Sequence, residues 1–475
     1  MASTQVIHTS DDECFNWDVI GHTLRCRSEQ PQKEITIAFD DIICVMPKAS
    51  RGETVYVLLF VQVDKNGSLD LKSPRMLLGN VKLATAPSFL SHYMWTQIPH
   101  HLCSSSSIQR SIYVVISTAS GTRTGASLYR NILQPLLSYI GVFGYELHET
   151  ESTQTVTELC HTRFIPRAQK QLPQTIILLS GDGGLADIID AFHSTVKTLI
   201  VPPSIALIPT GTGNAMANSL GLLAYPATAL VALLQGVTAD IPTFAARFSP
   251  GANYITDEGC GRVSVAHDAS DDQADSKIFG GIVASWGVHA ALVADSDTIE
   301  YRKFGADRFK LAAKEILFPS NGAETHKFSG TVTLFKWDSQ ARNIREEILG
   351  RGEHMYVLAT LVSTLEKDFV ISPLSKPLDG NLWMIRFGPM SPTRALEVMT
   401  SAYQGGQHVS DKSVFYDKIE GFRVQFCEPA EKWRRVCIDG KIVAVEAGGW
   451  MEVHKESRAL VNVLLLQNHT YPDSN

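Results

Sequence analysis

The sequence predicts an α/β fold in three parts: an N-terminal β-rich module, a central α/β domain and a mainly antiparallel β domain. Three observations predict this fold. Strand-like runs occupy residues 1–105, short apolar runs alternate with amphipathic stretches over residues 110–240, and strand-like runs return over residues 241–465. The 475 residues, of which 44% are apolar, suffice for more than one hydrophobic core.

Two strand patterns predict the N-terminal module. Residues 34–39 alternate apolar and polar side chains, and residues 55–63 form a run rich in β-branched and aromatic residues. Asn66-Gly67 then predicts a hairpin turn, and the serines at 104–107 predict a linker. We expect the module either to meet a membrane or partner protein or to be a structural extension of the core.

The central domain shows the alternation of strands and helices that is typical of a parallel sheet with crossover helices. Apolar runs at residues 112–116, 174–179 and 205–208 predict three of its strands. After the second run, apolar residues recur at i, i+3, i+4 and i+7 from Leu185, which predicts an amphipathic helix.

Strand-like runs over residues 241–465 predict the second domain, which consists mainly of antiparallel strands. Within it, residues 248–277 contain several glycines and a cluster of aspartates. This composition predicts an exposed insertion.

Two glycine-rich turns each follow an apolar run and precede a helical stretch. The first reads Ser180-Gly181-Asp182-Gly183-Gly184, and the second reads Pro209-Thr210-Gly211-Thr212-Gly213-Asn214. Glycine adopts positive φ and lets a bulky anion approach the backbone, and a helix that starts there points unpaired N–H groups at the same spot. Two such turns, with a carboxylate in the first, predict a nucleotide phosphate site that contains an acid or metal-binding group.

In order and spacing, these motifs resemble the catalytic region of the diacylglycerol kinase and sphingosine kinase superfamily. The family's first loop reads Gly/Ser-Gly-Asp-Gly with a Glu a few residues on, and its second reads Pro-x-Gly-Ser/Thr-Gly-Asn. The resemblance extends over residues 110–460 and is closest to the sphingosine (sphingoid long-chain base) kinases. It implies a Rossmann-like nucleotide-binding domain, a β-sandwich-like domain and an active site in the cleft between them, with ATP and Mg²⁺ as cofactors.

The resemblance implies roles for two carboxylates near the first turn. Asp182 is the candidate general base, which accepts the proton of the acceptor hydroxyl. From the residues alone, Asp182 is also a favoured N-cap for the helix that follows it. Asp187 stands where the family usually has Glu and is the candidate Mg²⁺ ligand, with an ordinary solvated helix position as its alternative.

The resemblance also implies which residues bind ATP. They are Ser120, Gly121, Thr150, Ser180, Gly181, Gly183, Thr210, Gly211, Thr212, Gly213, Asn214, Arg302, Arg308, Asp439 and Gly440. Thr150 has an ordinary strand or turn position as its alternative. The sequence departs from the family where Ser117 and Thr118 replace Asn-Pro, and where Lys441 replaces the Glu of a Val-Asp-Gly-Glu strand. The second departure reverses a charge near the nucleotide.

A further segment resembles sphingosine kinases through Asp295, Tyr301, Arg302 and Arg308. The resemblance implies that both guanidinium groups approach the nucleotide phosphates, for which arginine is well suited. It also implies that Asp295 contacts the polar head of the lipid, where an acidic group suits a cationic amine. Asp297 competes for this role, because the alignment here needs a small insertion.

The resemblance therefore implies an ATP-dependent lipid kinase that phosphorylates the primary hydroxyl of a sphingoid base to its 1-phosphate. Diacylglycerol and ceramide remain alternative acceptors, because no motif reveals the shape of the lipid pocket. Lys441 and Ser117-Thr118 favour a second hypothesis, a non-catalytic relative that binds lipid or nucleotide. A kinase for a soluble acceptor such as NAD is the third, because that family shares a similar Gly-Gly-Asp-Gly loop.

Composition and charge limit the kinds of molecule that we expect this protein to bind. The net charge of −7 without a Lys/Arg tract argues against nucleic acid, and the eight cysteines form no C-x-x-C pair that would suggest zinc. The sequence shows no signal-peptide pattern and no apolar run long enough to span a membrane. We expect a cytoplasmic protein that associates peripherally with a membrane, at whose surface the lipid substrate is presented.

Overall fold

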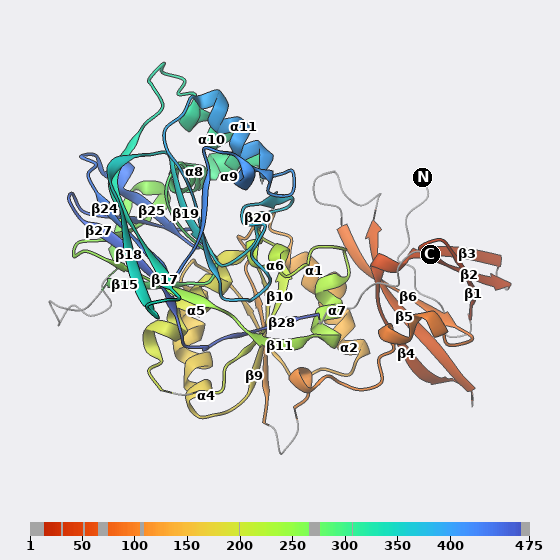
Figure 1. Ribbon diagram of the computed structural model, residues 1–475. Coiled ribbons are helices and arrows are strands. Elements are labelled where there is room, and N and C mark those ends of the chain that lie inside the picture. The colour runs from red at the N-terminus through yellow and green to blue at the C-terminus, as the bar shows by residue number, and fades with distance from the viewer. Residues whose placement is uncertain are drawn as a thin grey trace.

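The computed structural model describes residues 14–29, 32–50, 53–64, 75–104, 109–198, 200–265, 276–305 and 307–466 (Figure 1). It is a mixed α/β structure with several sheets, which confirms the predicted fold class at that level. No helix within these ranges is both long and apolar enough to cross a membrane. The predicted Asn66-Gly67 turn and most of the predicted serine linker lie outside the described residues.

The N-terminal module consists of two three-stranded antiparallel sheets that share one hydrophobic core. The first sheet contains β1 (Asn16–Ile20), β2 (Thr23–Glu29) and β3 (Gln32–Ala38), and the second contains β4 (Ile42–Ser50), β5 (Glu53–Asp64) and β6 (Arg75–Leu83). Leu24 from the first sheet and Leu58 and Phe60 from the second are buried in this core.

The second sheet packs its other face on the central domain. Side chains alternate along a strand, and Leu59 and Val61 of β5 belong to the same buried cluster as Leu137 of the central domain. Asn80 Nδ2 also donates a hydrogen bond of 3.0 Å to Tyr139 Oη. These contacts support the expectation of a structural extension of the core.

Six strands form the central sheet, in the order β11-β28-β10-β9-β7-β8. They are β7 (Ser111–Ile116), β8 (Glu146–Glu149), β9 (Gln174–Ser180), β10 (Ser204–Pro209), β11 (Val237–Asp240) and β28 (Asn462–Leu465). Neighbouring strands from β28 to β8 are parallel, whereas β11 is antiparallel to β28. The carboxyl ends of β7, β9 and β10 therefore lie at one edge of the sheet.

The last strand, β28, belongs to the central sheet and not to the domain in which it was predicted to lie. The sequence analysis placed all residues up to 465 in the antiparallel domain, but β28 returns to the central sheet between β10 and β11. Val463 and Leu464 are buried there. Their apolar run is typical of a buried strand in either domain, so the sequence pattern could not predict which sheet this strand joins.

Helices cover the central sheet. They are α1 (Gly125–Leu128), α2 (Gln134–Tyr139), α3 (Thr155–Leu159), α4 (Ile165–Gln169), α5 (Asp182–Thr195), α6 (Ala215–Ser219) and α7 (Thr228–Gln235). The π-helical turn η4 (Tyr129–Leu133) joins α1 to α2, and η5 (Cys160–Phe164) joins α3 to α4. Pro135 and Pro166 follow these turns, and because proline lacks an N–H, α-helical pairing is interrupted there.

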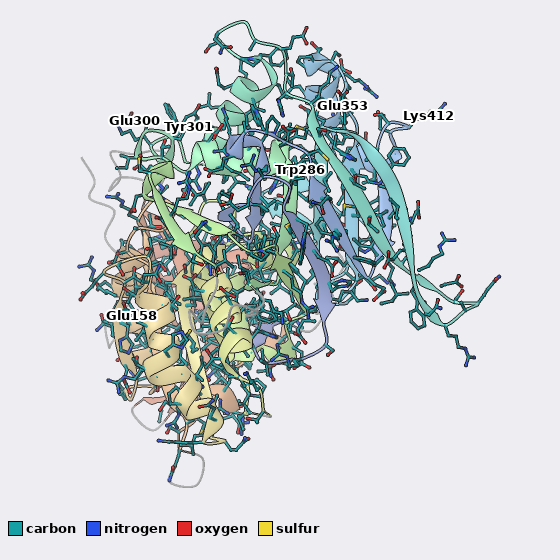
Figure 2. The ribbon with its side chains drawn as sticks, turned by 90° about the vertical axis from the view of Figure 1, so that its left-hand side faces the viewer. Glu158, Trp286, Glu300, Tyr301, Glu353 and Lys412 are labelled. Atoms are coloured by element: carbon teal, nitrogen blue, oxygen red, sulfur yellow. The ribbon has the colours of Figure 1, made fainter. Side chains whose placement is uncertain are left out.

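Two antiparallel sheets form the C-terminal domain. The six-stranded sheet contains, in order, β15 (Ser276–Gly280), β12 (Thr243–Phe248), β27 (Trp450–Glu456), β24 (Gly421–Phe426), β17 (Phe328–Asp338) and β18 (Asn343–His354). The eight-stranded sheet contains β14 (Gly261–Ser264), β13 (Asn253–Thr256), β26 (Lys441–Ala444), β25 (Arg435–Ile438), β16 (Val283–Gly287), β19 (Tyr356–Thr360), β22 (Leu382–Phe387) and β23 (Phe415–Ile419). Trp286 of the second sheet, which is labelled in Figure 2, lies in the interior of this domain. It packs edge-on against Phe328 and Phe426 of the first sheet.

In its described residues, this domain also contains four α-helices, the 3-10 helices η6 (Asp257–Gly259), η7 (Gln407–Ser410) and η8 (Glu431–Arg434), and a small hairpin. The α-helices are α8 (Val288–Ser296), α9 (Ile299–Arg302), α10 (Asp307–Leu317) and α11 (Pro392–Ser401), and the hairpin pairs β20 (Thr364–Glu366) with β21 (Phe369–Val370). Within the predicted insertion at residues 248–277, the described residues form short strands, since β13 pairs with both β14 and β26, and most residues of 253–264 are exposed or half-buried. The aspartates that suggested exposure fall in residues 266–275, outside the described residues.

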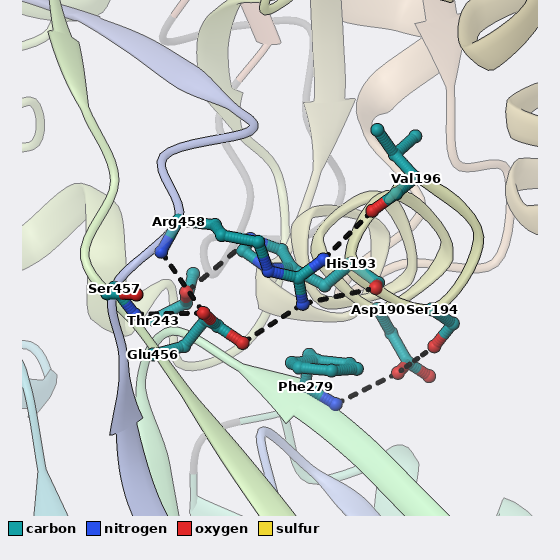
Figure 3. A network of polar contacts seen from close by, with 9 residues as sticks. All are labelled: Asp190, His193, Ser194, Val196, Thr243, Phe279, Glu456, Ser457 and Arg458. Carbon is teal, nitrogen blue, oxygen red and sulfur yellow. Dashed lines mark hydrogen bonds and ion pairs between the residues drawn. The ribbon is translucent and has the colours of Figure 1, made fainter. Parts of the chain in front are cut away.

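A polar network joins α5 to the C-terminal domain (Figure 3). Arg458 NH1 donates to the carbonyl of Val196 at 2.8 Å, and its other terminal nitrogen pairs with Glu456 Oε2 at 3.0 Å. The amide of Phe279 donates to Asp190 Oδ1 at 2.9 Å. The helix that carries the first glycine turn is therefore held from the side of the second domain.

Candidate active site

Three loops meet at the carboxyl edge of the central sheet. The loop after β7 contributes Ser117 and Ser120, the first glycine turn follows β9, and the second follows β10. Ser117 Oγ donates to Ser180 Oγ at 2.8 Å, and the amide of Gly181 donates to Ser120 Oγ at 3.0 Å. The amide of Thr210 donates to the carbonyl of Ser180 at 3.0 Å. The first glycine turn is thus bonded to both of its neighbours.

Glycine is required where these loops touch. A Cβ added to Gly181 would lie 2.9 Å from Gly211 Cα, and one added to Gly211 would overlap the backbone of Gly181. Gly121 has φ +52°, and an added Cβ would overlap the carbonyl of Thr210. By contrast, a Cβ on Gly183 would meet nothing within 4 Å, so open space lies above the start of α5. Unpaired amides at such a helix start are suited to a phosphate.

Asp182 bridges the two glycine turns. It is the first residue of α5, but its Oδ2 accepts from the amide of Ala215 at 2.7 Å and its Oδ1 from the amide of Met216 at 3.1 Å. It therefore caps α6 and not its own helix, whose N-cap is Gly181. Burial raises the pKa of Asp182, and these amides oppose the rise only in part. A raised pKa makes a carboxylate a better proton acceptor.

Asn214 closes the second glycine turn on itself. Its backbone is left-handed at φ 53°, its Oδ1 accepts from the amide of Gly211 at 2.9 Å, and its Nδ2 donates to the carbonyl of Gly211 at 2.9 Å. The side chain thus shapes the turn. The hydroxyl of Thr210 is buried and has no hydrogen-bond partner among the residues that the structure describes, whereas Thr212 is partly exposed.

The two residues that replace the family's Asn-Pro make contacts of their own. The amide of Thr118 donates to Thr150 Oγ1 at 3.0 Å, and Thr118 Oγ1 donates to the carbonyl of Thr150 at 2.7 Å. Proline has no N–H and no hydroxyl, so it could make neither bond. Thr150 thereby lies beside the loop after β7, and Ser117 is bonded to the first glycine turn.

Asp439 faces the site from the C-terminal domain but is fully engaged by the backbone. Its carboxylate accepts hydrogen bonds from the amides of Gly281, Ile282 and Val283 at 2.6, 3.0 and 2.7 Å. Burial raises the pKa of Asp439 to about 6, and the nearby charge of Asp182 adds to the effect. Gly440 follows at φ +88° in the tight turn between β25 and β26.

Asp187 does not fit the expected role of a metal ligand. Lys441 Nζ lies 2.9 Å from Asp187 Oδ1 and 3.2 Å from Asp190 Oδ2. An ammonium group has no lone pair to offer to a metal and repels it. Within the described ranges, no three His, Cys, Asp or Glu side chains are grouped so that they could hold a metal ion.

The predicted arginines and lipid-head carboxylate form a separate cluster around α8–α10. Asp297 Oδ1 accepts from Arg302 Nε at 3.0 Å and from Arg308 at 3.3 Å. Asp295 Oδ1 accepts from Arg435 at 2.8 Å. In the described part of the chain, both arginines thus pair with Asp297 and contact neither glycine turn.

The sequence reasoning missed two residues that build this site. Asp190 shares Lys441 with Asp187, and its i, i+3 spacing from Asp187 on a predicted helix was a usable signal. Arg435 lies on β25 and forms an ion pair with Asp295. No local sequence pattern could have predicted this long-range pair.

Comparisons with known proteins found one matching family and several solved structures. Residues 111–246 match the family described as the diacylglycerol kinase catalytic domain. No curated protein matches the chain. Three solved structures from Bacillus anthracis str. Sterne, described, two of them provisionally, as diacylglycerol kinases, share 12–14% identity with it. Each match covers 75% of this chain and 97% of the other, with TM-scores of 0.48, 0.44 and 0.47.

Over residues 111–246 the chain is similar to the catalytic domain of diacylglycerol kinases, which supports a lipid kinase of this general type. Kinases of this family use ATP and generally a divalent metal ion. Structural similarity at these identities and TM-scores does not indicate an activity. The predicted closeness to sphingosine kinases stays a prediction.

Proposed function

We propose that this protein transfers the γ-phosphoryl group of ATP to the primary hydroxyl of a sphingoid base. One observation carries the proposal: Asp182 lies where both glycine turns meet, with its carboxylate bonded across them and its pKa raised by burial. The amides at the start of α5 would receive the phosphates. Diacylglycerol and ceramide are the alternative acceptors.

In the proposed reaction, the acceptor oxygen attacks the γ-phosphorus while the bond to the β–γ bridging oxygen breaks. ADP leaves, and the hydroxyl proton passes to Asp182. Phosphoryl transfer depends mainly on positioning and on neutralising the phosphate charge. Arg302 and Arg308 could contribute only after they leave Asp297, so their role as ATP ligands is part of this proposal.

Apolar surface near the arginine cluster supports a lipid acceptor. Ile299 on α9 is 63% exposed, Phe304 is 52% exposed, and Leu311 and Phe318 of the α10 region are also exposed. Grouped exposed apolar side chains mark contact with a membrane or ligand. The cationic head of a sphingoid base would have to displace Arg435 from Asp295, or the two arginines from Asp297.

A phosphotransfer assay with labelled ATP tests the proposal. Wild type, Asp182→Asn and Glu158→Gln are compared on sphingosine, dihydrosphingosine, diacylglycerol, ceramide and NAD. Glu158 is an exposed carboxylate on α3 and is the matched control (Figure 2). We expect labelled sphingoid base with wild type and Glu158→Gln but not with Asp182→Asn. Transfer to another acceptor would identify that acceptor as the substrate in place of a sphingoid base. If wild type bound ATP without transferring phosphate, the protein would not be a kinase for these acceptors.

A further inference from the structure

A buried cluster of three charges joins α5 to β26. Asp187 and Asp190 lie one turn apart on α5, and the ammonium of Lys441 lies between them at 2.9 and 3.2 Å. The side chains of Asp187, Asp190 and Lys441 are 18%, 10% and 25% exposed. Charges this buried are stable only when they are paired.

Asp190 has a second bond that fixes which of its oxygens pairs with Lys441. Asp190 Oδ1 accepts from the amide of Phe279 at 2.9 Å (Figure 3). Its other oxygen, Oδ2, is the one that pairs with Lys441. Burial alone would lower the pKa of Lys441, but Asp187 and Asp190 outweigh it and raise the pKa, so the amine stays charged. The ammonium is therefore a permanent cation at this point.

Two carboxylates that converge on one point form a typical cation position. Mg²⁺ is held by carboxylate oxygens at about 2.0–2.1 Å and keeps several waters. A metal could bind both carboxylates here only after displacing an ammonium that is tethered to β26. The tether keeps the local concentration of the ammonium high whatever the metal concentration in solution.

We propose that Lys441 is a built-in cation that replaces a protein-bound divalent ion at Asp187 and Asp190. The chain then binds no divalent ion of its own at this position, and the metal of the proposed reaction arrives with the phosphates of ATP. The origin of the reaction's metal ion rests on the proposed function, whereas the absence of a divalent ion at Asp187 and Asp190 rests on the ion pairs alone.

The replacement has a consequence for the active site. Asp182 begins the helix that carries Asp187 and Asp190. Lys441 follows the turn that contains Asp439, whose carboxylate holds the amides of residues 281–283. Lys441 is thus a positioning residue that fixes the first glycine turn against the C-terminal domain without any metal.

Binding of Mn²⁺ to the nucleotide-free protein tests this inference without any assay of activity. Free Mn²⁺ is measured by electron paramagnetic resonance for wild type, Lys441→Glu, Lys441→Met and Lys455→Met. Lys455, which pairs with Glu420 at 2.6 Å, is the matched control for loss of a paired lysine. Thermal unfolding of each variant is followed with and without Mn²⁺.

We expect no Mn²⁺ bound to wild type or Lys455→Met. Lys441→Glu places three carboxylates around one point and is expected to bind one Mn²⁺, which raises its melting temperature. If Lys441→Glu fails to fold, Lys441→Met carries the test, with an affinity for Mn²⁺ at least about ten-fold above wild type.

Two results would overturn the inference. The first is one Mn²⁺ bound to nucleotide-free wild type and lost in Asp187→Asn, which would make Asp187 a metal ligand despite Lys441. The second is no gain of Mn²⁺ binding in either Lys441 variant, which would mean that the ammonium does not stand at a cation position. Because no lipid or ATP is present, both results are distinct from a failure of the proposed kinase activity.

Discussion

Gly181→Ala tests whether close packing of the two glycine turns holds the active site together. Gly181 has φ −87° and ψ −166°, which any residue adopts, so the substitution brings no backbone strain. Its Cβ would lie 2.9 Å from Gly211 Cα and 3.3 Å from Ser120 Oγ. Non-bonded carbons prefer about 3.5–4.0 Å. The turns would therefore have to separate by about 0.6–1.1 Å.

The expected loss of stability follows from this separation. Overpacking of a rigid contact costs about 1–3 kcal/mol, and here the neighbour is backbone, which cannot rotate away. Replacing glycine by alanine stabilises the folded protein by about 0.4–1 kcal/mol, because it lowers the entropy of the unfolded chain. Alanine is a poorer N-cap than glycine by a similar amount, so these two effects roughly cancel. We expect a net loss of about 2 kcal/mol.

Urea denaturation followed by tryptophan fluorescence measures the effect, with Gly183→Ala as the matched control. Gly183 lies two residues away inside α5, and its Cβ would meet nothing within 4 Å. The control should gain about 0.5–1 kcal/mol, as helical glycine-to-alanine exchanges do. Affinity for ATP should fall at least about ten-fold in Gly181→Ala, since the amides of the two turns move apart. Equal stability of the two variants within about 0.5 kcal/mol would refute the packing argument.

Three further predictions concern single side chains. Asp182→Asn should lower kcat by about 10²–10⁴-fold, measured by steady-state phosphotransfer; an unchanged kcat would exclude Asp182 as the base. Asp439 has its pKa raised from 3.8 to about 6 in the folded protein, so its stabilising protonation is complete below pH 3.8 and lost as the pH rises through 6. Relative to Asp439→Asn, wild type should therefore lose about 2 kcal/mol of unfolding free energy between pH 4 and pH 7, measured in urea; parallel pH profiles would contradict this. Thr118→Pro, which restores the family's residue, should destabilise by about 1–3 kcal/mol, since it removes both bonds to Thr150; an unchanged melting temperature would show that these bonds contribute nothing.

Local patterns predicted the central strands β7, β9 and β10 and the helix at the first glycine turn. The spacing from Leu185 placed an apolar face on α5, and Leu185, Ile188 and Phe192 are indeed buried. The return of β28 to the central sheet could not be predicted, because pairing with β10 is a long-range choice among equally apolar strands. Composition also did not reveal the short strands β13 and β14, because their residues are polar and mostly exposed or half-buried.

For the candidate site, the sequence located the loops better than it located the side chains' partners. Both glycine turns and Asp182 lie together, as their position after parallel strands predicted. That Asp182 would cap α6, and that Arg302 and Arg308 would share Asp297, depends on side-chain geometry at contacts between distant segments. No local pattern encodes such contacts.

Asp187 and Lys441 look like two independent departures when each is compared with the family alone. In the structure they contact each other, so the shorter acid and the reversed charge form one coupled change. A double-mutant cycle with Asp187→Asn and Lys441→Met measures that coupling by urea denaturation. Breaking a buried pair from one side leaves an uncompensated charge and costs about 3–5 kcal/mol. Removing both partners should cost clearly less than the two single changes together, with a coupling energy of about 1–3 kcal/mol. Additive effects would show that the two positions changed independently.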